Sequence, residues 1–211
     1  TQVGNMPRLL PLIAVNHSNY MEIDPATRRS LELSRTLAGE RRGSLLHAVD
    51  CTLTAAGGRL LGEHLAAPLF DVDAIDSRLD LVSWFIAGTV CREEVRAQLR
   101  VHPDSERALS RLSLGHGGPR DLAAVANGLK GASRIAGHIT DSVNKGVSSL
   151  AMPQSLPACL EMMLLPVPLV DEVAPALGDE LPLLARDGGF VRQGYDIALD
   201  DLRGLRDESR R

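Results

Sequence analysis

The segment from Gly118 to Ile139 constrains the fold of this chain more than any other part of the sequence. It reads GPRDLAAVANGLKGASRIAGHI, and its apolar residues recur every three or four positions along one side: Leu122, Val125, Leu129, Ala132, Ile135 and Ile139. This spacing is that of an amphipathic helix. Pro119 favours a helix start, because the first helical residue has no intrahelical use for its N–H. Aromatic residues make up only 3% of the chain, which favours helix packing over a β-sandwich. We therefore predict a mainly α-helical fold.

Shorter helical patterns flank this segment. Asp24 and Pro25 form a strong start signal for a short helix that passes Leu31 and Leu33. Asp104 is the expected N-cap of another helix. Further helices are predicted in residues 44–50, 54–68, 71–88, 92–102, 160–164 and 170–177. The helix in 71–88 carries one clear apolar stripe, made of Ile75, Leu79, Val82 and Ile86.

Two small β elements accompany the predicted helices. The stretch YMEI, residues 20–23, alternates enough to predict a short strand near the N-terminus. The stretch LLARDGGFVRQG predicts a small β-hairpin before the last helix, because Gly188 and Gly189 supply positive-φ positions after Asp187. Between residues 140 and 157 the content of Ser, Gly and Pro predicts an exposed loop.

The last sixteen residues look like a helix that has only begun. Asp196 is the expected N-cap, and Leu199, Leu202 and Leu205 form an apolar stripe behind it. No glycine or proline stop signal follows, so we expect the chain to be part of a longer protein, trimmed at both ends. The expected organisation is an extended lead-in over 1–24, a helical core over 25–195 and the root of a long helix over 196–211.

Composition excludes some classes of function. The net charge of −4 argues against a stand-alone basic DNA-binding surface. The cysteines, three in number and without a CxxC pair, suggest neither a zinc site nor a disulfide framework. The sequence has no long apolar run, so we expect no membrane span. A reducing compartment is the default, and we expect the protein in the cytoplasm.

Motifs for catalysis are missing from the sequence. It contains no P-loop, no G-x-S-x-G and no H-E-x-x-H motif. The glycine-rich GHGGPRD stretch could bind an anion at a helix start, but a structural turn is the better interpretation. Arg41 and Arg42 could touch phosphate, although a solvated or salt-bridged pair is favoured. An enzyme would need a dispersed cluster such as His47, Glu63 and His64, and no spacing supports it.

Four stretches, taken together and in this order, resemble the core (lever) domain of the MutS family of DNA mismatch-recognition proteins. They are MEIDPATRRSLEL, AVDCTLTAAGGRLLGEHLAAPLFD, ERALSRLSLGHGGPRDLA and ARDGGFVRQGYDIALDDLRGLRDESR, and the resemblance covers most of the chain. Ser30 stands where the family usually has asparagine, and Ala198 where a charged residue is common. The resemblance implies that the helix from Asp196 continues as one arm of a lever that reaches a DNA clamp.

The family resemblance also implies a function. The chain is expected to be a structural and allosteric segment without a catalytic, metal or cofactor site. The parent protein is expected to bind ATP and Mg²⁺ in a separate ATPase domain, to act as a homodimer on mismatched duplex DNA, and to engage a MutL-type partner. The chain alone is expected to bind DNA weakly or not at all. An independent helical scaffold that binds another protein is the alternative from a different functional class.

The residues expected to matter are structural. We expect polar ties between helices from Asp50, Arg59, Arg111 and Asp121, although solvation at the surface is the competing interpretation for all four. The glycines of the 187–194 turn are expected to set the angle at which the last helix leaves. The full set of candidates is Asp24, Asp50, Arg59, Arg111, Asp121, Gly188, Gly189 and Tyr195.

Overall fold

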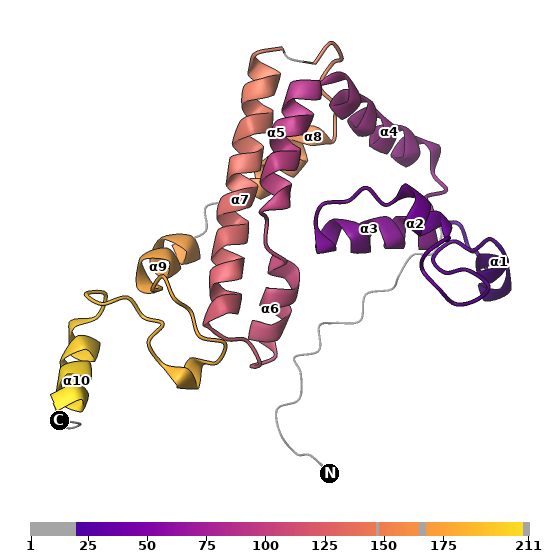
Figure 1. The fold of residues 1–211 in the computed structure, drawn as a ribbon. Coiled ribbons are helices and arrows are strands. Elements are labelled where there is room, and N and C mark those ends of the chain that lie inside the picture. The colour runs from indigo at the N-terminus through magenta and orange to yellow at the C-terminus, as the bar shows by residue number, and fades with distance from the viewer. Residues whose placement is uncertain (1–19, 147, 165–167, 209–211) are drawn as a thin grey trace. The chain divides into compact units, whose positions relative to one another are not determined.

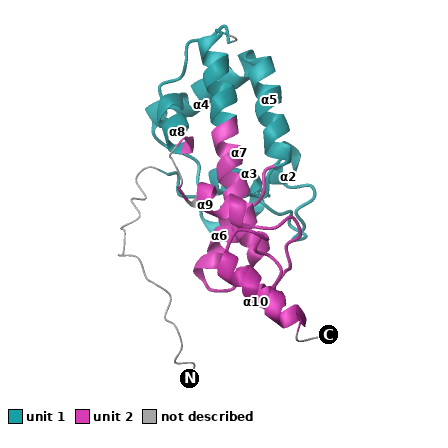
Figure 2. Cartoon of the chain, turned by 90° about the vertical axis from the view of Figure 1, so that its left-hand side faces the viewer, with its two compact units in different colours: residues 1–101, 135–162 teal, residues 102–134, 163–211 magenta. Residues whose placement is uncertain are grey.

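The protein is represented by a computed structural model that describes residues 20–146, 148–164 and 168–208 (Figure 1). Of these, the residues up to Val101 form one compact unit together with Ile135–Met162, and His102–Arg134 forms a second unit with the residues from Met163 onward (Figure 2). The predicted lead-in over 1–24 lies outside the described residues as far as residue 19.

Helices dominate both units, as the sequence predicts. The first unit contains α1 (Pro25–Ser30), α2 (Leu45–Val49), α3 (Ala55–Ala66), α4 (Val72–Ala87), α5 (Thr89–Arg100) and α8 (Leu156–Met163). The second contains α6 (Ser105–Ser113), α9 (Pro168–Ala176), the 3₁₀ turn η2 (Ala185–Asp187) and α10 (Ile197–Glu208). The longest helix, α7 (Pro119–Asn144), contributes its first part to the second unit and its last part to the first.

Side-chain caps fix where many of these helices begin. Asp24 accepts hydrogen bonds from the N–H groups of the first turn of α1, and Asp71 does the same for Ala74 at the start of α4. Asp104 caps α6 as predicted, and Asp196 caps α10 by accepting from Leu199 N–H at 3.1 Å. Each cap pairs an N–H that has no partner inside the helix, which is why short polar side chains mark these positions in the sequence.

The core of the first unit forms where α4, α5, α8 and the C-terminal part of α7 meet (Figure 1). Trp84, the only tryptophan of the chain, is 2% exposed, and its ring packs edge-on against that of Phe85. Cys91 on α5, Ile139 on α7 and Leu156 on α8 are also buried. Trp84 therefore lies at the centre of a core whose other buried residues are mostly aliphatic.

The core of the second unit lies between the first part of α7, α9 and the chain that follows α9. Its buried centre is Ala126, Val173 and Leu177, and Leu122 and Phe190 pack against it. All six residues of the predicted α7 stripe are buried or half-buried, so this prediction is confirmed. Small residues on α7 also let α6 approach closely, a feature that the apolar pattern did not indicate.

The two predicted β elements are wrong. Over the described residues the structure has no β-strand, only isolated antiparallel bridges that join Tyr20 to Leu69 and Leu177 to Val191. The expected hairpin fails because the chain after Gly189 pairs with the end of α9 instead of with residues 183–186. Phe190 C=O accepts from Gly178 N–H, and Arg192 N–H donates to Ala176 C=O, each at 2.8 Å. The positive φ expected at Gly188 and Gly189 is present, at 69° and 76°.

Three further expectations differ from the structure. The first helix ends at Ser30, before Leu31 and Leu33, because Glu32 takes a left-handed conformation with φ of 48°. Helix α7 continues to Asn144 and α8 already begins at Leu156, so both ends of the loop predicted over 140–157 are helical. The apolar stripe of α4 mostly faces outward. Leu79, Val82 and Ile86 are each about half exposed or more, because α4 turns the side that carries Trp84 inward.

Candidate functional site

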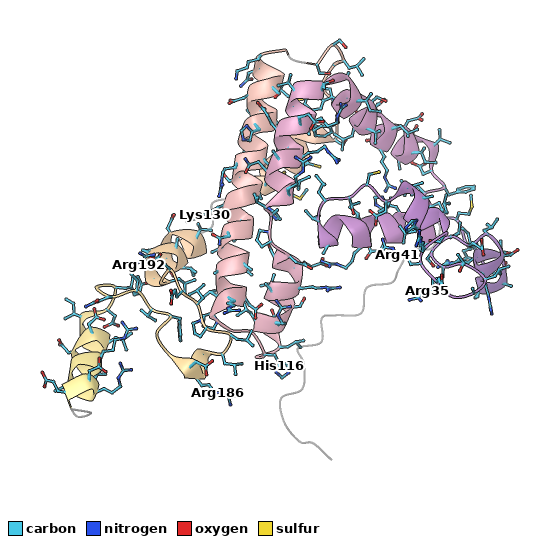
Figure 3. The ribbon with its side chains drawn as sticks, in the orientation of Figure 1. Arg35, Arg41, His116, Lys130, Arg186 and Arg192 are labelled. Atoms are coloured by element: carbon cyan, nitrogen blue, oxygen red, sulfur yellow. The ribbon has the colours of Figure 1, made fainter. Side chains whose placement is uncertain are left out.

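The predicted site residues lie at loop–helix junctions, one of which surrounds Asp50 in the first unit. Asp50 Oδ1 accepts from Thr52 N–H at 3.0 Å and from Thr52 Oγ1 at 2.6 Å. Asp50 Oδ2 forms an ion pair with Arg41. The pKa of Asp50 lies below the ordinary carboxyl value, chiefly because of the Thr52 hydroxyl and then the Thr52 N–H. Arg41, which is labelled in Figure 3, is therefore salt-bridged, in agreement with the interpretation favoured over phosphate binding.

The same junction holds the start of α3. Thr54 caps this helix by accepting from Gly57 N–H at 3.0 Å. A Cβ added at Gly58 would lie 3.3 Å from Thr52 Oγ1 and 4.0 Å from Asp50 Oδ2, so the α3 backbone closely approaches the Asp50 cluster. Arg59 follows on α3 and is half-buried.

The second junction joins α6 to α7 through an ion pair between Arg111 and Asp121 in the second unit. Arg111 Nε donates to Asp121 Oδ1 at 2.9 Å, and Arg111 Nη2 contacts the same oxygen. Asp121 Oδ2 accepts from Gly118 N–H at 3.0 Å. This is the reach of an acidic side chain back to the N-cap N–H that is seen in capping boxes. The pKa of Asp121 is lowered, first by the Arg111 hydrogen bond and then by Gly118 N–H.

This arrangement decides between the two interpretations of the GHGGPRD stretch. The carboxylate of Asp121 already occupies the N-terminus of α7, where an anion would bind. The chain around Leu183 covers the same end, since a Cβ added at Gly118 would collide with Leu183 C=O. Arg120 Nε also donates to Leu181 C=O at 2.7 Å. The stretch is a structural turn that holds α6, α7 and residues 181–183 together.

The third junction leads from α9 to α10. Arg192 Nε donates to Leu177 C=O at 3.2 Å, and Arg192 Nη2 pairs with Asp179 at 3.0 Å (Figure 3). Tyr195, a predicted site residue, lies at the end of this segment, and its hydroxyl donates to Glu172 C=O on α9 at 3.5 Å. These bonds fasten the chain after Gly189 to α9.

Helix α10 is held to that same segment by Asp200 and Arg203. Asp200 Oδ2 accepts from Gly194 N–H at 2.6 Å, and Asp200 Oδ1 accepts from Arg203 Nη1 at 2.9 Å. Arg203 Nη2 donates to Val191 C=O at 2.9 Å. Sequence reasoning missed Arg192, Asp200 and Arg203. The three-residue spacing of Asp200 and Arg203 is a usable signal for their pair, whereas no local pattern marks Arg192.

The apolar stripe of α10 lies mostly at the surface of this chain. Leu202 and Leu205 are 63% and 64% exposed, and Ile197 is 78% exposed, while Leu199 is half-buried. The helix is thus positioned by polar bonds at its first turns and not by burial of its apolar side.

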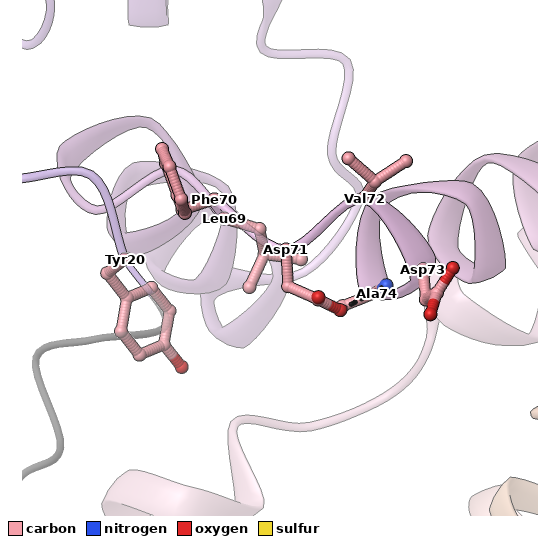
Figure 4. Close-up of a pocket in the computed structure, with 7 residues that line it drawn as sticks. All are labelled: Tyr20, Leu69, Phe70, Asp71, Val72, Asp73 and Ala74. Atoms are coloured by element: carbon pink, nitrogen blue, oxygen red, sulfur yellow. Dashed lines mark hydrogen bonds between the residues drawn. The ribbon is translucent and has the colours of Figure 1, made fainter.

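The described part of the first unit has pockets at its surface. One pocket of about 490 Å³ lies beside the bridge between Tyr20 and Leu69, and its wall includes Asp71 (Figure 4). The Asp71 carboxylate accepts from Ala74 N–H at 2.9 Å, as the dashed line in Figure 4 marks. Within the described parts of the chain, no three His, Cys, Asp or Glu side chains gather as a metal-binding group. His47, Glu63 and His64 are not brought into such a group.

None of the described helices has the length and apolar content needed to cross a membrane.

Comparison with known proteins identifies the family. The family model for MutS domain III matches residues 26–210. The DNA mismatch repair protein MutS of Rhodopseudomonas palustris strain BisB5 is 52% identical over 212 aligned residues, which cover all of this chain and 22% of the relative. The corresponding proteins of Nitrobacter winogradskyi and Azorhizobium caulinodans are 50% and 49% identical, with 23% and 22% of their lengths covered.

The chain therefore spans less than a quarter of the length of these curated relatives, and the alignment covers all of this chain. The order of the matching stretches, the all-helical architecture of the described residues and the model match over 26–210 agree with one another. This chain belongs to the MutS domain III family and is a segment of a MutS-type DNA mismatch repair protein.

Proposed function

We propose that this chain works in its parent protein as a structural and allosteric core that couples the state of an ATPase to clamp closure on mismatched DNA. In this proposal residues 1–24 lead in, residues 25–195 form the core, and residues 196–211 are the root of the lever. The observation that carries the proposal is the set of hydrogen bonds at the root of α10, which bind Arg203 and Asp200 to the backbone of Val191 and Gly194.

A stiff root is what a lever needs. Force or displacement passes through a protein only where elements keep discrete, well-packed arrangements. At the root of α10 the anchoring partners are mostly backbone groups of the segment that is itself bonded to α9. We propose that the junctions at Asp50 and at Arg111–Asp121 each hold the helices of their own unit in a single arrangement.

ATP and Mg²⁺ enter the proposal only through the parent protein. The residues of this chain do not fit a nucleotide–magnesium site, since the sequence lacks a P-loop and the described residues lack a cluster of acidic ligands. We propose that both bind in another part of the parent, and that mismatched duplex DNA, a second copy of the parent and a MutL-type protein are its partners in the cytoplasm. No catalytic step is assigned to this chain.

The test uses the full-length protein that contains this chain. We compare Arg203→Ala with Arg186→Ala, a matched loss of charge at an exposed arginine of the same unit. Three quantities are measured: affinity for a mismatched duplex, ATP hydrolysis without DNA, and ATP-triggered release from the mismatch. We expect Arg203→Ala to change the third quantity while hydrolysis without DNA stays near wild type, and Arg186→Ala to change none.

Two outcomes would reject the proposal. The first is an Arg203→Ala protein with unaltered ATP-triggered release. The second is evidence for the alternative, an independent helical scaffold in which the exposed Leu202 and Leu205 would bind a partner. An antibody against this chain should detect a band several times heavier than 22.7 kDa in the source cell. A single band at 22.7 kDa would favour the scaffold.

A further inference from the structure

Helix α4 carries an apolar stripe that the described residues leave largely uncovered. Leu79, Val82 and Ile86 are 54%, 49% and 63% exposed, and Val72 extends the stripe to the first turn of the helix. With about 100° of rotation per residue, the stripe from Ile75 to Ile86 occupies an arc of about 60° on one side of the helix. Single exposed apolar side chains are common, but a continuous row of them indicates a surface that binds another element.

The opposite side of α4 already packs in the core of the first unit. Trp84 is buried there, and Leu81 and Phe85 are half-buried. A helix that buries one side in its own domain normally has polar residues on the other side. Helix α4 is apolar on both sides, so the packing of this unit explains only one of them.

An acidic row borders the stripe along one edge. Asp73, Asp76 and Asp80 follow one another at three- and four-residue steps, and Asp76 lies about 60° around the helix from Leu79. The same three residues line a groove of about 670 Å³ between α4 and residues 150–154. Within the described ranges none of the three forms an ion pair. Their charges are therefore available to positive groups of an element that covers the stripe.

The shape of the stripe suits another helix. From Val72 to Ile86 it runs for about 21 Å along a convex helix surface, and such a surface packs against the ridges and grooves of a second helix. The chain covers 22% of its Rhodopseudomonas palustris relative, so most of that protein lies outside the matched region. A segment of the same polypeptide has a high effective concentration at the stripe, which favours it over a separate molecule.

We propose that the α4 stripe is covered by a helix of the parent polypeptide that lies outside residues 1–211. This helix has an apolar side that packs on Leu79, Val82 and Ile86, and lysine or arginine residues that face Asp76 and Asp80. Burial of the apolar sides supplies the affinity, and the acidic row along one edge only selects the orientation of the helix. The proposal rests on the membership of this chain in a longer protein and does not depend on the coupling proposed above.

The experiment measures how accessible the stripe is in two proteins, the full-length parent and the 211-residue chain. Leu79→Cys and Ile86→Cys are made separately in both, and the rate of reaction with a maleimide is followed under native conditions. Mass spectrometry of the peptide that contains the new cysteine separates its signal from those of Cys51, Cys91 and Cys159. The rate in urea gives the intrinsic reactivity of each position, and circular dichroism verifies that each variant keeps its helix content.

We expect both cysteines to react at least about tenfold more slowly in the full-length protein than in the 211-residue chain, because the covering helix must open first. The difference should not depend on protein concentration. Adding Asp80→Lys to Ile86→Cys in the full-length protein should raise the reaction rate severalfold, since a like charge then faces the basic residues. Glu161→Lys is the matched control, because Glu161 is an exposed acid on α8 of the same unit, and it should leave the rate unchanged.

Four outcomes would overturn the proposal. Equal rates in the two proteins would show that the parent does not cover the stripe and leaves it to a separate protein or to solvent. Protection that appears in the 211-residue chain and grows with its concentration would identify a second copy as the occupant. An unchanged rate with Asp80→Lys, or an equal increase with Glu161→Lys, would show that no basic residues face the acidic row. None of these outcomes bears on ATP-triggered release, so the function proposed above is tested separately.

Discussion

Glycines on α7 provide a direct test of how α6 packs against this helix. Gly128 is buried, and a Cβ added there would overlap Ser105 Oγ and lie 2.9 Å from Ser105 Cβ. Gly137 is exposed on the same helix, and a Cβ added there meets nothing within 4 Å among the described residues. The two positions therefore separate the effect of helix propensity from the effect of packing.

The free energy of unfolding should move in opposite directions in the two alanine variants. Gly→Ala in a helix interior contributes about 0.5–1 kcal/mol of stability where space is free, so Gly137→Ala should be more stable by that amount. Gly128→Ala gains the same propensity but forces α6 away from α7, at an overpacking cost of about 1–3 kcal/mol. We expect the two variants to differ by about 1–3 kcal/mol in favour of Gly137→Ala, and by a few degrees in Tm.

The assay is urea unfolding followed by far-UV circular dichroism, with Tm from the same signal. Gly204→Ala on α10 serves as a second control, because it lies in the same unit as Gly128 and has open space around it. Adding Ser105→Ala to Gly128→Ala should recover part of the loss, since the hydroxyl is removed while the close Cβ remains. Equal stabilisation by Gly128→Ala and Gly137→Ala would refute the close approach of α6 to α7.

Four other outcomes follow from the structure. Valine at Gly188 or Gly189 should destabilise the chain by about 1–3 kcal/mol per position, because both have positive φ, which a β-branched residue rarely adopts; an unchanged Tm would contradict this. The folded-state pKa of Asp121 is depressed, so its contribution to stability is present above about pH 4 and is lost as the pH falls further; the urea midpoints of wild type and Asp121→Asn should approach each other as the pH is lowered below that value, and a constant difference would argue against the ion pair. Burial lowers the pKa of His102, so the folded state favours neutral imidazole and stability should fall as the pH drops below about 6.5; His102→Asn should reduce that fall, and an identical pH profile would exclude His102 as a cause. In anisotropy titrations the purified chain should bind duplex DNA weakly and equally with and without a G·T mismatch, and a clear mismatch preference would contradict the role proposed for it.

Local chemistry made much of the architecture predictable from the sequence. Helix starts at Asp24, Asp104 and Asp196 were visible because an N-cap depends on one side chain and the N–H groups that follow within three residues. The α7 stripe was visible because i, i+3 and i+4 positions share a side of any helix. The positive φ at Gly188 and Gly189 was equally local, since glycine after aspartate is typical of tight turns.

Interactions between distant segments could only come from the tertiary structure. A turn signal at Gly188 does not determine which segment the chain meets next, and here it meets the end of α9 at Leu177 instead of forming a hairpin. The stripe of α4 shows the same limit. Its spacing marks an apolar side, but the fold buries the side that holds Trp84. The anchoring of Arg203 by Val191 C=O likewise depends on a contact that no periodicity encodes. The sequence by itself determined where the helices are and how most of them start, because those choices depend on neighbours within four residues. Which helix sides are buried, and which charges meet, was decided by the packing of segments that lie far apart in the chain.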